Sequence, residues 1–265
     1  MIILFIILLL LILYLFLIAP SFQNHPDKEV LKGMKIAHRG YHDIVGNSPE
    51  NSMNAFSEAM KKGYTIENDI HITRDNEVVV FHDDTLKRMC GEDKVIEDLT
   101  LEEIKKYTLK DSDQKIPTLK ECLDLVDGKV PLLIEFKAFN MDHTKRLCEE
   151  ADKILSEYKG KYFIQSFYPF VLNWYKKNRP DILRGQLAEN KKGKPIKERL
   201  LGFLIFNFLS RPHFLSYSYE SPRFLPRKLC SMLGALPVCW TLPDKKAFEE
   251  SKKHFKAFIF ENFEA

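Results

Sequence analysis

Short apolar runs alternate with amphipathic stretches along most of the chain. The amphipathic stretches have the spacing of helices, for example over residues 52–62, 142–158, 168–178 and 244–254. Eight apolar runs have the length of buried strands, and they cover residues 34–38, 65–69, 131–135, 162–166, 183–187, 214–217, 236–240 and 257–260. Because repeated strand–helix alternation indicates a parallel sheet, eight such units predict an α/β fold, a TIM-type (β/α)8 barrel.

One segment interrupts this alternation. Residues 77–82 (EVVVFH) follow the second strand after a short polar turn, which predicts a β-hairpin. If Thr73 pairs with Val78, Asp69 lies opposite His82, although a slip of one residue would remove that pairing.

An insertion over residues 83–130 follows the hairpin and is long enough to cover the rim of the barrel. It contains two helical patterns, over residues 101–107 and 118–126. Thr100 with Glu103, and Thr118 with Glu121, have the spacing of capping boxes. Each helix is therefore expected to begin directly after its threonine.

The N-terminus has a different pattern, because residues 2–19 form an apolar run without a charge. As a helix this run would cover ~27 Å, close to the ~30 Å of a bilayer core. No basic residue precedes it and no small-x-small cleavage site follows, so we expect a transmembrane helix over residues 1–20. A signal peptide and a buried core helix are the alternatives. Residues 21–33 are interpreted as a tether, and residues 34–265 as the barrel domain.

Charges near this run bear on its orientation. Lys28, Lys32 and Lys35 follow the helix, which favours a single-pass membrane protein with a cytoplasmic barrel domain. An extracytoplasmic domain remains the alternative.

Composition narrows the class of protein. The chain has 265 residues, of which 45% are hydrophobic and 29% charged, and a net charge of +3. This balance indicates a globular domain without the basic surface of a nucleic-acid-binding protein. The five cysteines include no C-x-x-C pair, so neither a disulfide framework nor a zinc site is expected. The sequence does not indicate an oligomeric state.

Polar side chains stand at the ends of several strand runs, which in a (β/α)8 barrel form the rim where active sites are built. Glu67 and Asp69 are two residues apart on one strand, so their side chains point to the same face. Glu135 ends the third strand. Carboxylates at a strand end are often only surface groups, but three of them form an all-oxygen set that suits Mg²⁺ or Ca²⁺.

Two histidines bracket the first two carboxylates. His38 and His82 can supply an acid and a base, because imidazole titrates near neutral pH. Arg39 has the planar donor fork that binds phosphate oxygens. Together these residues predict metal-assisted cleavage of a phosphate ester. We expect His42 and His71 to lie near the site without a direct role.

The same residues carry a family resemblance. The run HRGYHDIVGNSPENSMNAFSEAMKKGYTIENDIHITRDNEVVVFHDDTLKRMCG, with IPTLKECLDLV, LLIEFK and FIQSFYP, resembles the glycerophosphodiester phosphodiesterase family. The resemblance runs from about Met34 to Trp240. It implies a barrel that uses a divalent cation, Mg²⁺ or Ca²⁺, to hydrolyse a glycerophosphodiester to glycerol 3-phosphate and an alcohol.

The resemblance also implies a role for each matching residue. His38 and His82 would be the acid–base pair, and Glu67, Asp69 and Glu135 the metal ligands. Arg39, Lys137 and Trp240 would bind the substrate and its phosphate, while Glu50 and Asn51 would brace the rim. These expected roles rest on matching positions in the motifs.

The chain departs from the family pattern after its last strand. The family often has T-D-x-P there, whereas this chain has Ile259-Phe260-Glu261-Asn262-Phe263. The resemblance therefore does not define the far rim of the pocket, while the catalytic core is unaffected.

Two other functions are alternatives. A lysophospholipase D-type enzyme would act on lysophospholipids at the membrane, and the basic residues 191–199 beside the apolar residues 200–209 would favour it. A non-catalytic binding module would predict a degraded catalytic position, and none is seen.

Overall fold

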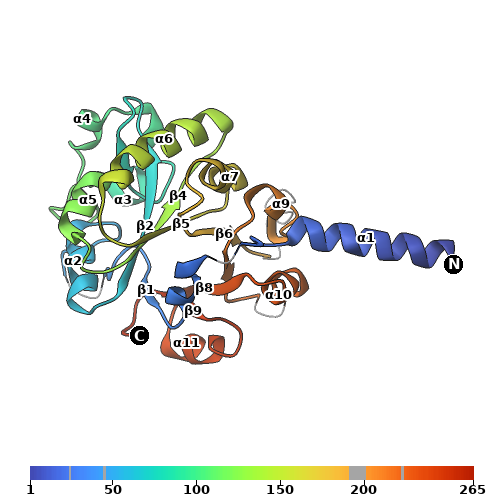
Figure 1. Ribbon diagram of the computed structural model, residues 1–265. Coiled ribbons are helices and arrows are strands. Elements are labelled where there is room, and N and C mark those ends of the chain that lie inside the picture. The colour runs from blue at the N-terminus through green and yellow to red at the C-terminus, as the bar shows by residue number, and fades with distance from the viewer. Residues whose placement is uncertain (24, 44–45, 191–200, 222–223) are drawn as a thin grey trace.

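The structure is a computed structural model that describes residues 1–265 except 24, 44–45, 191–200 and 222–223. Eight parallel strands close into a barrel, as the sequence predicts (Figure 1). These strands are β1 (Lys35–Ala37), β2 (Thr65–Ile72), β4 (Leu132–Phe136), β5 (Tyr162–Ser166), β6 (Arg184–Ala188), β7 (Phe214–Ser218), β8 (Leu236–Leu242) and β9 (Ala257–Phe260). The barrel closes because β1 pairs with both β2 and β9.

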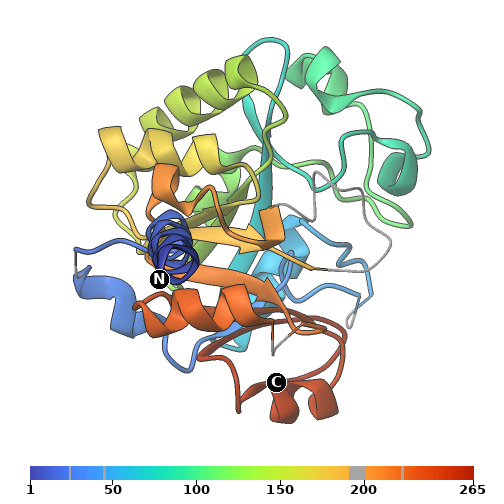
Figure 2. The same cartoon turned by 90° about the vertical axis from the view of Figure 1, so that its right-hand side faces the viewer.

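Helices surround the barrel and cover the outer face of its strands (Figures 1 and 2). They are α2 (Met53–Lys61), α5 (Leu119–Val126), α6 (Met141–Glu157), α7 (Pro169–Asn178), α9 (Asn207–Ser210), α10 (Leu225–Met232) and α11 (Lys245–Ser251). Their apolar faces and the outward side chains of the strands form the larger hydrophobic core. Leu147 and Ala151, four residues apart on α6, are both fully buried in it, as an amphipathic helix requires.

A second apolar cluster fills the barrel interior. Leu133, Phe163 and Phe214 belong to it, together with Leu31 from the 3₁₀ helix η1 (Pro26–Leu31). Side chains alternate along a strand, so the residue two positions after Leu133 faces the same interior. That residue is Glu135, and the apolar cluster therefore forms the floor beneath the polar rim.

The β-hairpin exists, but its register differs by one residue from the prediction. Strand β3 (Val78–Val80) pairs antiparallel with β2, and His71 lies opposite Val79. Asp69 therefore lies opposite Phe81, whose backbone N–H donates to the Asp69 carbonyl at 3.0 Å. The turn contains three residues instead of four, because Asn76 adopts a left-handed φ of 66° and closes it early.

The insertion after the hairpin packs its own small core beside the barrel. It contains α3 (Lys87–Cys90), the 3₁₀ helix η2 (Ile96–Asp98) and α4 (Leu101–Ile104), besides α5. Both predicted capping boxes are present, at Thr100 and at Thr118. Phe81, Ile96 and Ile104 are buried within this core, so the segment is firmly attached to the hairpin.

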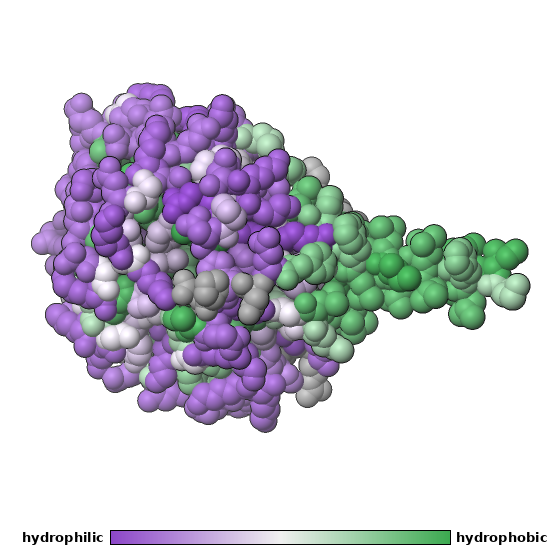
Figure 3. Space-filling view, viewed as in Figure 1, coloured by the Kyte–Doolittle hydropathy of each residue, from purple (hydrophilic) through white to green (hydrophobic). Residues whose placement is uncertain are grey.

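The prediction of a transmembrane helix over residues 1–20 is not supported. Helix α1 (Ile2–Ile18) has 17 residues, and no helix in the described part of the chain is long and apolar enough to cross a membrane. It ends at Ile18 because Pro20 disfavours a helical conformation at Ala19, which is extended with ψ 136°. Its apolar residues project from the polar body of the molecule in Figure 3.

The C-terminal end of α1 is held against the barrel. The Asn207 side chain donates to the Ile18 carbonyl at 3.0 Å, and Arg211 donates to the Phe16 and Ala19 carbonyls at 2.8 and 3.0 Å. Ile18 is fully buried as a result. The basic segment at residues 191–199, considered above as a membrane-facing feature, lies outside the described residues.

Gly185 offers a direct test of the barrel interior. It pairs with Phe214 across β6 and β7, and a Cβ added at Gly185 would overlap the Phe214 ring. Gly185→Ala is therefore expected to lower the free energy of unfolding by about 1–3 kcal/mol, measured by denaturant unfolding. In a Phe214→Leu background the same change should lower the free energy of unfolding by a smaller amount. Equal costs in both backgrounds would show that this ring does not occupy the space.

Candidate active site

Three carboxylates lie together at the carboxyl end of the barrel strands. The β2–β4 register pairs Asp69 directly with Glu135, and Glu67 precedes Asp69 by two residues on the same face. All three side chains are buried, with relative exposures of 1% for Glu67, 0% for Asp69 and 6% for Glu135. One oxygen of each lies within 4.8 Å of the others. The predicted all-oxygen cluster is therefore present.

Cationic and amide groups surround these carboxylates. Lys137 Nζ lies 2.5 Å from Glu135 Oε1 and 3.0 Å from Asp69 Oδ1. The backbone N–H of Arg39 donates to Glu67 Oε2 at 3.0 Å, and its Nε lies 3.6 Å from Asp69 Oδ2. Asn51 donates to Asp69 Oδ2 at 2.9 Å. Lys137 and Arg39 each approach two of the three acids.

The three acids ionise unequally because their surroundings differ. Burial raises the pKa of Glu67 well above its usual range, and the charges of Asp69 and Glu135 raise it further. Burial also raises the pKa of Glu135, against the opposing effect of Lys137. For Asp69, burial is outweighed by Lys137, His82 and Arg39, which hold its pKa well below the usual range. The negative charge of Glu67 is thus the least compensated of the three, and a bound cation would favour the ionised form of this carboxyl group.

Each candidate catalytic histidine is oriented by a carboxylate. His38 Nδ1 lies 2.7 Å from Glu261 Oε2, and His82 Nδ1 lies 2.7 Å from Asp83 Oδ1. With Nδ1 engaged in each ring, Nε2 is the nitrogen available for proton transfer.

Burial also changes the proton affinity of His38. It lowers the pKa of His38 to about 4, while the hydrogen bond to Glu261 acts in the opposite direction. His38 is therefore neutral at pH 7, with a proton on Nδ1 toward Glu261 and a free lone pair on Nε2. A neutral imidazole in this form can accept a proton from a nucleophile.

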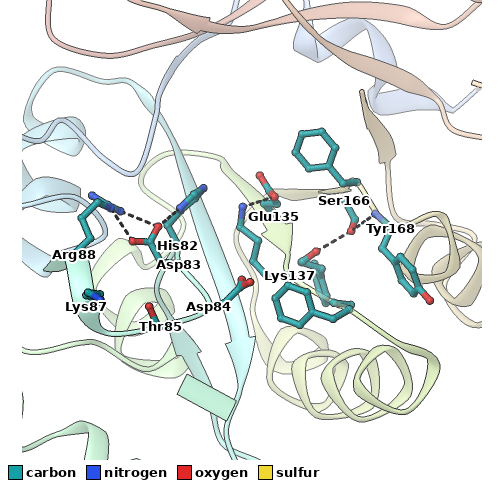
Figure 4. A pocket seen from close by; sticks show the side chains of 14 residues that line it. His82, Asp83, Asp84, Thr85, Lys87, Arg88, Glu135, Lys137, Ser166 and Tyr168 are labelled. Carbon is teal, nitrogen blue, oxygen red and sulfur yellow. Dashed lines mark hydrogen bonds and ion pairs between the residues drawn. The ribbon is translucent and has the colours of Figure 1, made fainter. Parts of the chain in front are cut away.

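A chain of ion pairs connects the two sides of the site. Arg88 on α3 donates to both Glu50 oxygens at 2.6 and 2.8 Å. It also donates to both Asp83 oxygens at 2.7 and 3.1 Å (Figure 4). Glu50 also accepts from Arg39 Nη1 at 2.9 Å. The insertion thereby holds the Asp83–His82 pair in a fixed position relative to Arg39.

The predicted site residues converge on one place. A cavity of about 80 Å³ is lined by seven of the eight, which are His38, Arg39, Glu67, His82, Glu135, Lys137 and Trp240. Asp69 lies buried beside them, in contact with Lys137. Trp240 is fixed by its indole N–H, which donates to the Ser216 carbonyl at 2.9 Å.

Sequence reasoning missed three residues that orient the histidines, namely Asp83, Arg88 and Glu261. Glu261 directly follows strand β9, so the strand-end criterion used for Glu135 would have identified it. Asp83 adjoins His82 in the chain, whereas nothing in the sequence pattern indicated Arg88.

His42 lies near the site as expected, 4.0 Å from Glu261, and His71 contacts the His82 carbonyl at 3.3 Å.

Comparisons with known proteins place the chain in a family. Residues 38–217 match the "Glycerophosphoryl diester phosphodiesterase family". A glycerophosphodiester phosphodiesterase of Caldanaerobacter subterraneus is 35% identical over 169 residues, which cover 60% of this chain and 68% of that protein. A human lysophospholipase D is 32% identical over 178 residues, covering 62% of this chain and 55% of that protein.

A solved structure shares the fold. The phosphodiesterase of Oleispira antarctica, in complex with its product sn-glycerol-3-phosphate, superposes with a TM-score of 0.71 at 21% identity. The match covers 88% of this chain and 94% of the other.

Glu261 provides a test of the histidine geometry that does not depend on activity. Its carboxylate favours the imidazolium form of His38, so Glu261→Gln should move the pKa of His38 below the value of about 4. An NMR titration of the imidazole resonances measures this shift. Glu264→Gln, which removes an exposed acid paired with Lys62, is the control and should leave His38 unchanged. An unaltered titration in Glu261→Gln would contradict the hydrogen bond.

Proposed function

The chain belongs to the glycerophosphoryl diester phosphodiesterase family, and from this premise we propose that it hydrolyses glycerophosphodiesters with His38 and His82 as its acid–base pair. The products are glycerol 3-phosphate and an alcohol. The observation that carries the proposal is that two carboxylate-oriented imidazoles line one small cavity together with Glu67 and Glu135, which form a carboxylate cluster with the buried Asp69.

Glu67, Asp69 and Glu135 would hold a divalent cation. Their donor atoms are all oxygen, lie within 4.8 Å of one another and belong to buried side chains, which fits Mg²⁺ or Ca²⁺. When bound, such a cation neutralises charge on the phosphate oxygens and stabilises the negative charge of the transition state. Lys137 forms ion pairs with Asp69 and Glu135 but not with Glu67. A cation bound beside Glu67 would therefore neutralise the acid that has the least nearby positive charge.

The chain's own residues supply binding and proton transfer. Arg39 and Lys137 line the cavity as cations and favour a phosphate group there. His38, neutral at pH 7, takes a proton at Nε2 from the nucleophile, which is water or the neighbouring glycerol hydroxyl. Attack by water gives glycerol 3-phosphate directly, whereas attack by the hydroxyl gives a cyclic phosphate that a water molecule then opens to glycerol 3-phosphate. His82 donates a proton to the oxygen of the leaving alcohol.

Asp83 supports the acid role of His82. Partial burial opposes its ionisation, but hydrogen bonds from His82 and Arg88 hold the pKa of Asp83 below its usual range. Asp83 therefore stays a carboxylate and faces Nδ1 of the ring. A carboxylate in this position holds the ring through Nδ1 and leaves Nε2 as the nitrogen that can transfer a proton.

A lysophospholipid is the second candidate substrate. The human relative with 32% identity is named a lysophospholipase D.

Removal of either imidazole tests the proposed mechanism. His38→Ala and His82→Ala are each expected to slow release of glycerol 3-phosphate from glycerophosphoethanolamine by about 10²- to 10⁴-fold, because each deletes one proton-transfer group. Circular dichroism should show an intact fold. His143→Ala is the matched control, because that ring pairs with Glu97 outside the cavity. Near-normal turnover in either test variant would refute the assignment.

A further inference from the structure

A second group of metal-ligating side chains lies beside the three-carboxylate cluster. His38, His42 and Glu261 each have a donor atom within 4.8 Å of the other two. His38 directly follows β1 and Glu261 directly follows β9, and these two strands pair in the barrel. His42 lies in the loop between β1 and α2 and has no part in the proposed mechanism.

The loop after β1 holds His42 in a defined position. The backbone N–H of Tyr41 donates to the Ala55 carbonyl on α2 at 2.9 Å. The backbone N–H of Asp43 donates to the Ser48 carbonyl, also at 2.9 Å. The His42 side chain between these two contacts is only 7% exposed, so its ring is buried at the barrel mouth.

Only one of the two ring nitrogens of His42 has a hydrogen-bond partner. Nδ1 lies 2.9 Å from Asp43 Oδ2 and donates to that carboxylate. Nε2 is buried, has no hydrogen-bond partner within the described part of the chain, and lies 4.0 Å from Glu261 Oε2. A buried polar atom without a partner costs about 1–3 kcal/mol. A carboxylate on one ring nitrogen and a free lone pair on the other is the arrangement of a metal-binding histidine.

The spacing of the three donor groups is close to that of zinc ligands. Glu261 Oε2 lies 2.7 Å from His38 Nδ1 and 4.0 Å from His42 Nε2. Ligands of a tetrahedral Zn²⁺ lie roughly 3.3 Å apart, so each distance would change by only about half an ångström. Two imidazole nitrogens and one carboxylate oxygen form a set that suits Zn²⁺, whereas Mg²⁺ and Ca²⁺ prefer oxygen ligands alone.

We propose that His38, His42 and Glu261 form a second cation site that prefers Zn²⁺, and that Zn²⁺ bound there inhibits the enzyme. The inhibition rests on the proposed function. Zn²⁺ at His38 Nδ1 displaces the proton from that nitrogen, and the neutral ring carries the proton on Nε2 instead, so no proton is gained or lost overall. Nε2 then has no lone pair with which to accept a proton from the nucleophile.

Co²⁺ binding tests the site without an activity measurement, because Co²⁺ replaces Zn²⁺ and its visible absorption reports its ligands. In excess Mg²⁺ the wild-type protein is expected to bind Co²⁺ and to release it when Zn²⁺ is added. His42→Gln should weaken Co²⁺ binding by at least about tenfold, since it removes a ligand, and Asp43→Asn by about tenfold, since it removes the carboxylate that orients the ring. Glu67→Gln changes the other cluster and should retain the Co²⁺ absorption.

Inhibition is measured on glycerophosphoethanolamine hydrolysis in Mg²⁺ or Ca²⁺. Zn²⁺ should slow the wild-type enzyme by about 10²- to 10⁴-fold, the value of a lost general base, and excess Mg²⁺ should not restore the rate. His42→Gln should retain the wild-type rate without Zn²⁺ and require at least about tenfold more Zn²⁺ for half inhibition. His143→Gln, which changes a histidine paired with Glu97, is the control and should keep the wild-type sensitivity to Zn²⁺.

The outcomes separate this inference from the proposed function. Equal Co²⁺ affinity in wild type and His42→Gln, loss of the Co²⁺ absorption in Glu67→Gln, or equal Zn²⁺ inhibition in wild type and His42→Gln would overturn the second site and leave the diesterase standing. Absence of hydrolysis in either Mg²⁺ or Ca²⁺ without Zn²⁺ would overturn the proposed function, while the Co²⁺ measurement would still decide whether the second site exists.

Discussion

The burial of three carboxylates at one end of the barrel is the constraint on which the rest of the structure depends. Two like charges about 4 Å apart repel by roughly 4 kcal/mol even at an effective dielectric constant near 20. Glu67, Asp69 and Glu135 lie within 4.8 Å of one another and are almost inaccessible to solvent. Such a cluster persists only with strong compensation, which Lys137 and Arg39 supply in part.

This compensation organises the catalytic groups around the acids. Arg39 contacts both the acid cluster and Glu50, and Glu50 contacts Arg88 on the insertion. Arg88 in turn holds Asp83 beside His82. On the opposite side Glu261 holds His38. The charges that keep the acids buried and those that orient the histidines thus form one connected set, so the barrel mouth and the insertion are parts of a single site.

Much of this arrangement could be predicted from the sequence, because it follows from local periodicity. Alternation along β2 puts Glu67 and Asp69 on one face, and the strand-end rule brings Glu135 beside them. The hairpin register was wrong by one residue, since turn length depends on the left-handed conformation of Asn76. Arg88 could not be predicted, because its contacts with Glu50 join residues 38 positions apart through a fold that only the structure shows.

Calorimetric titration of the chelator-treated protein with Mg²⁺ and Ca²⁺ tests most directly whether Glu67, Asp69 and Glu135 hold a divalent cation. At least one of these ions is expected to bind at one site per chain. Glu67→Gln should weaken that binding by at least about tenfold, since it removes one charged ligand at the least compensated position. A wild-type protein that binds neither ion, yet hydrolyses its diester in excess EDTA, would contradict a cation site at these carboxylates.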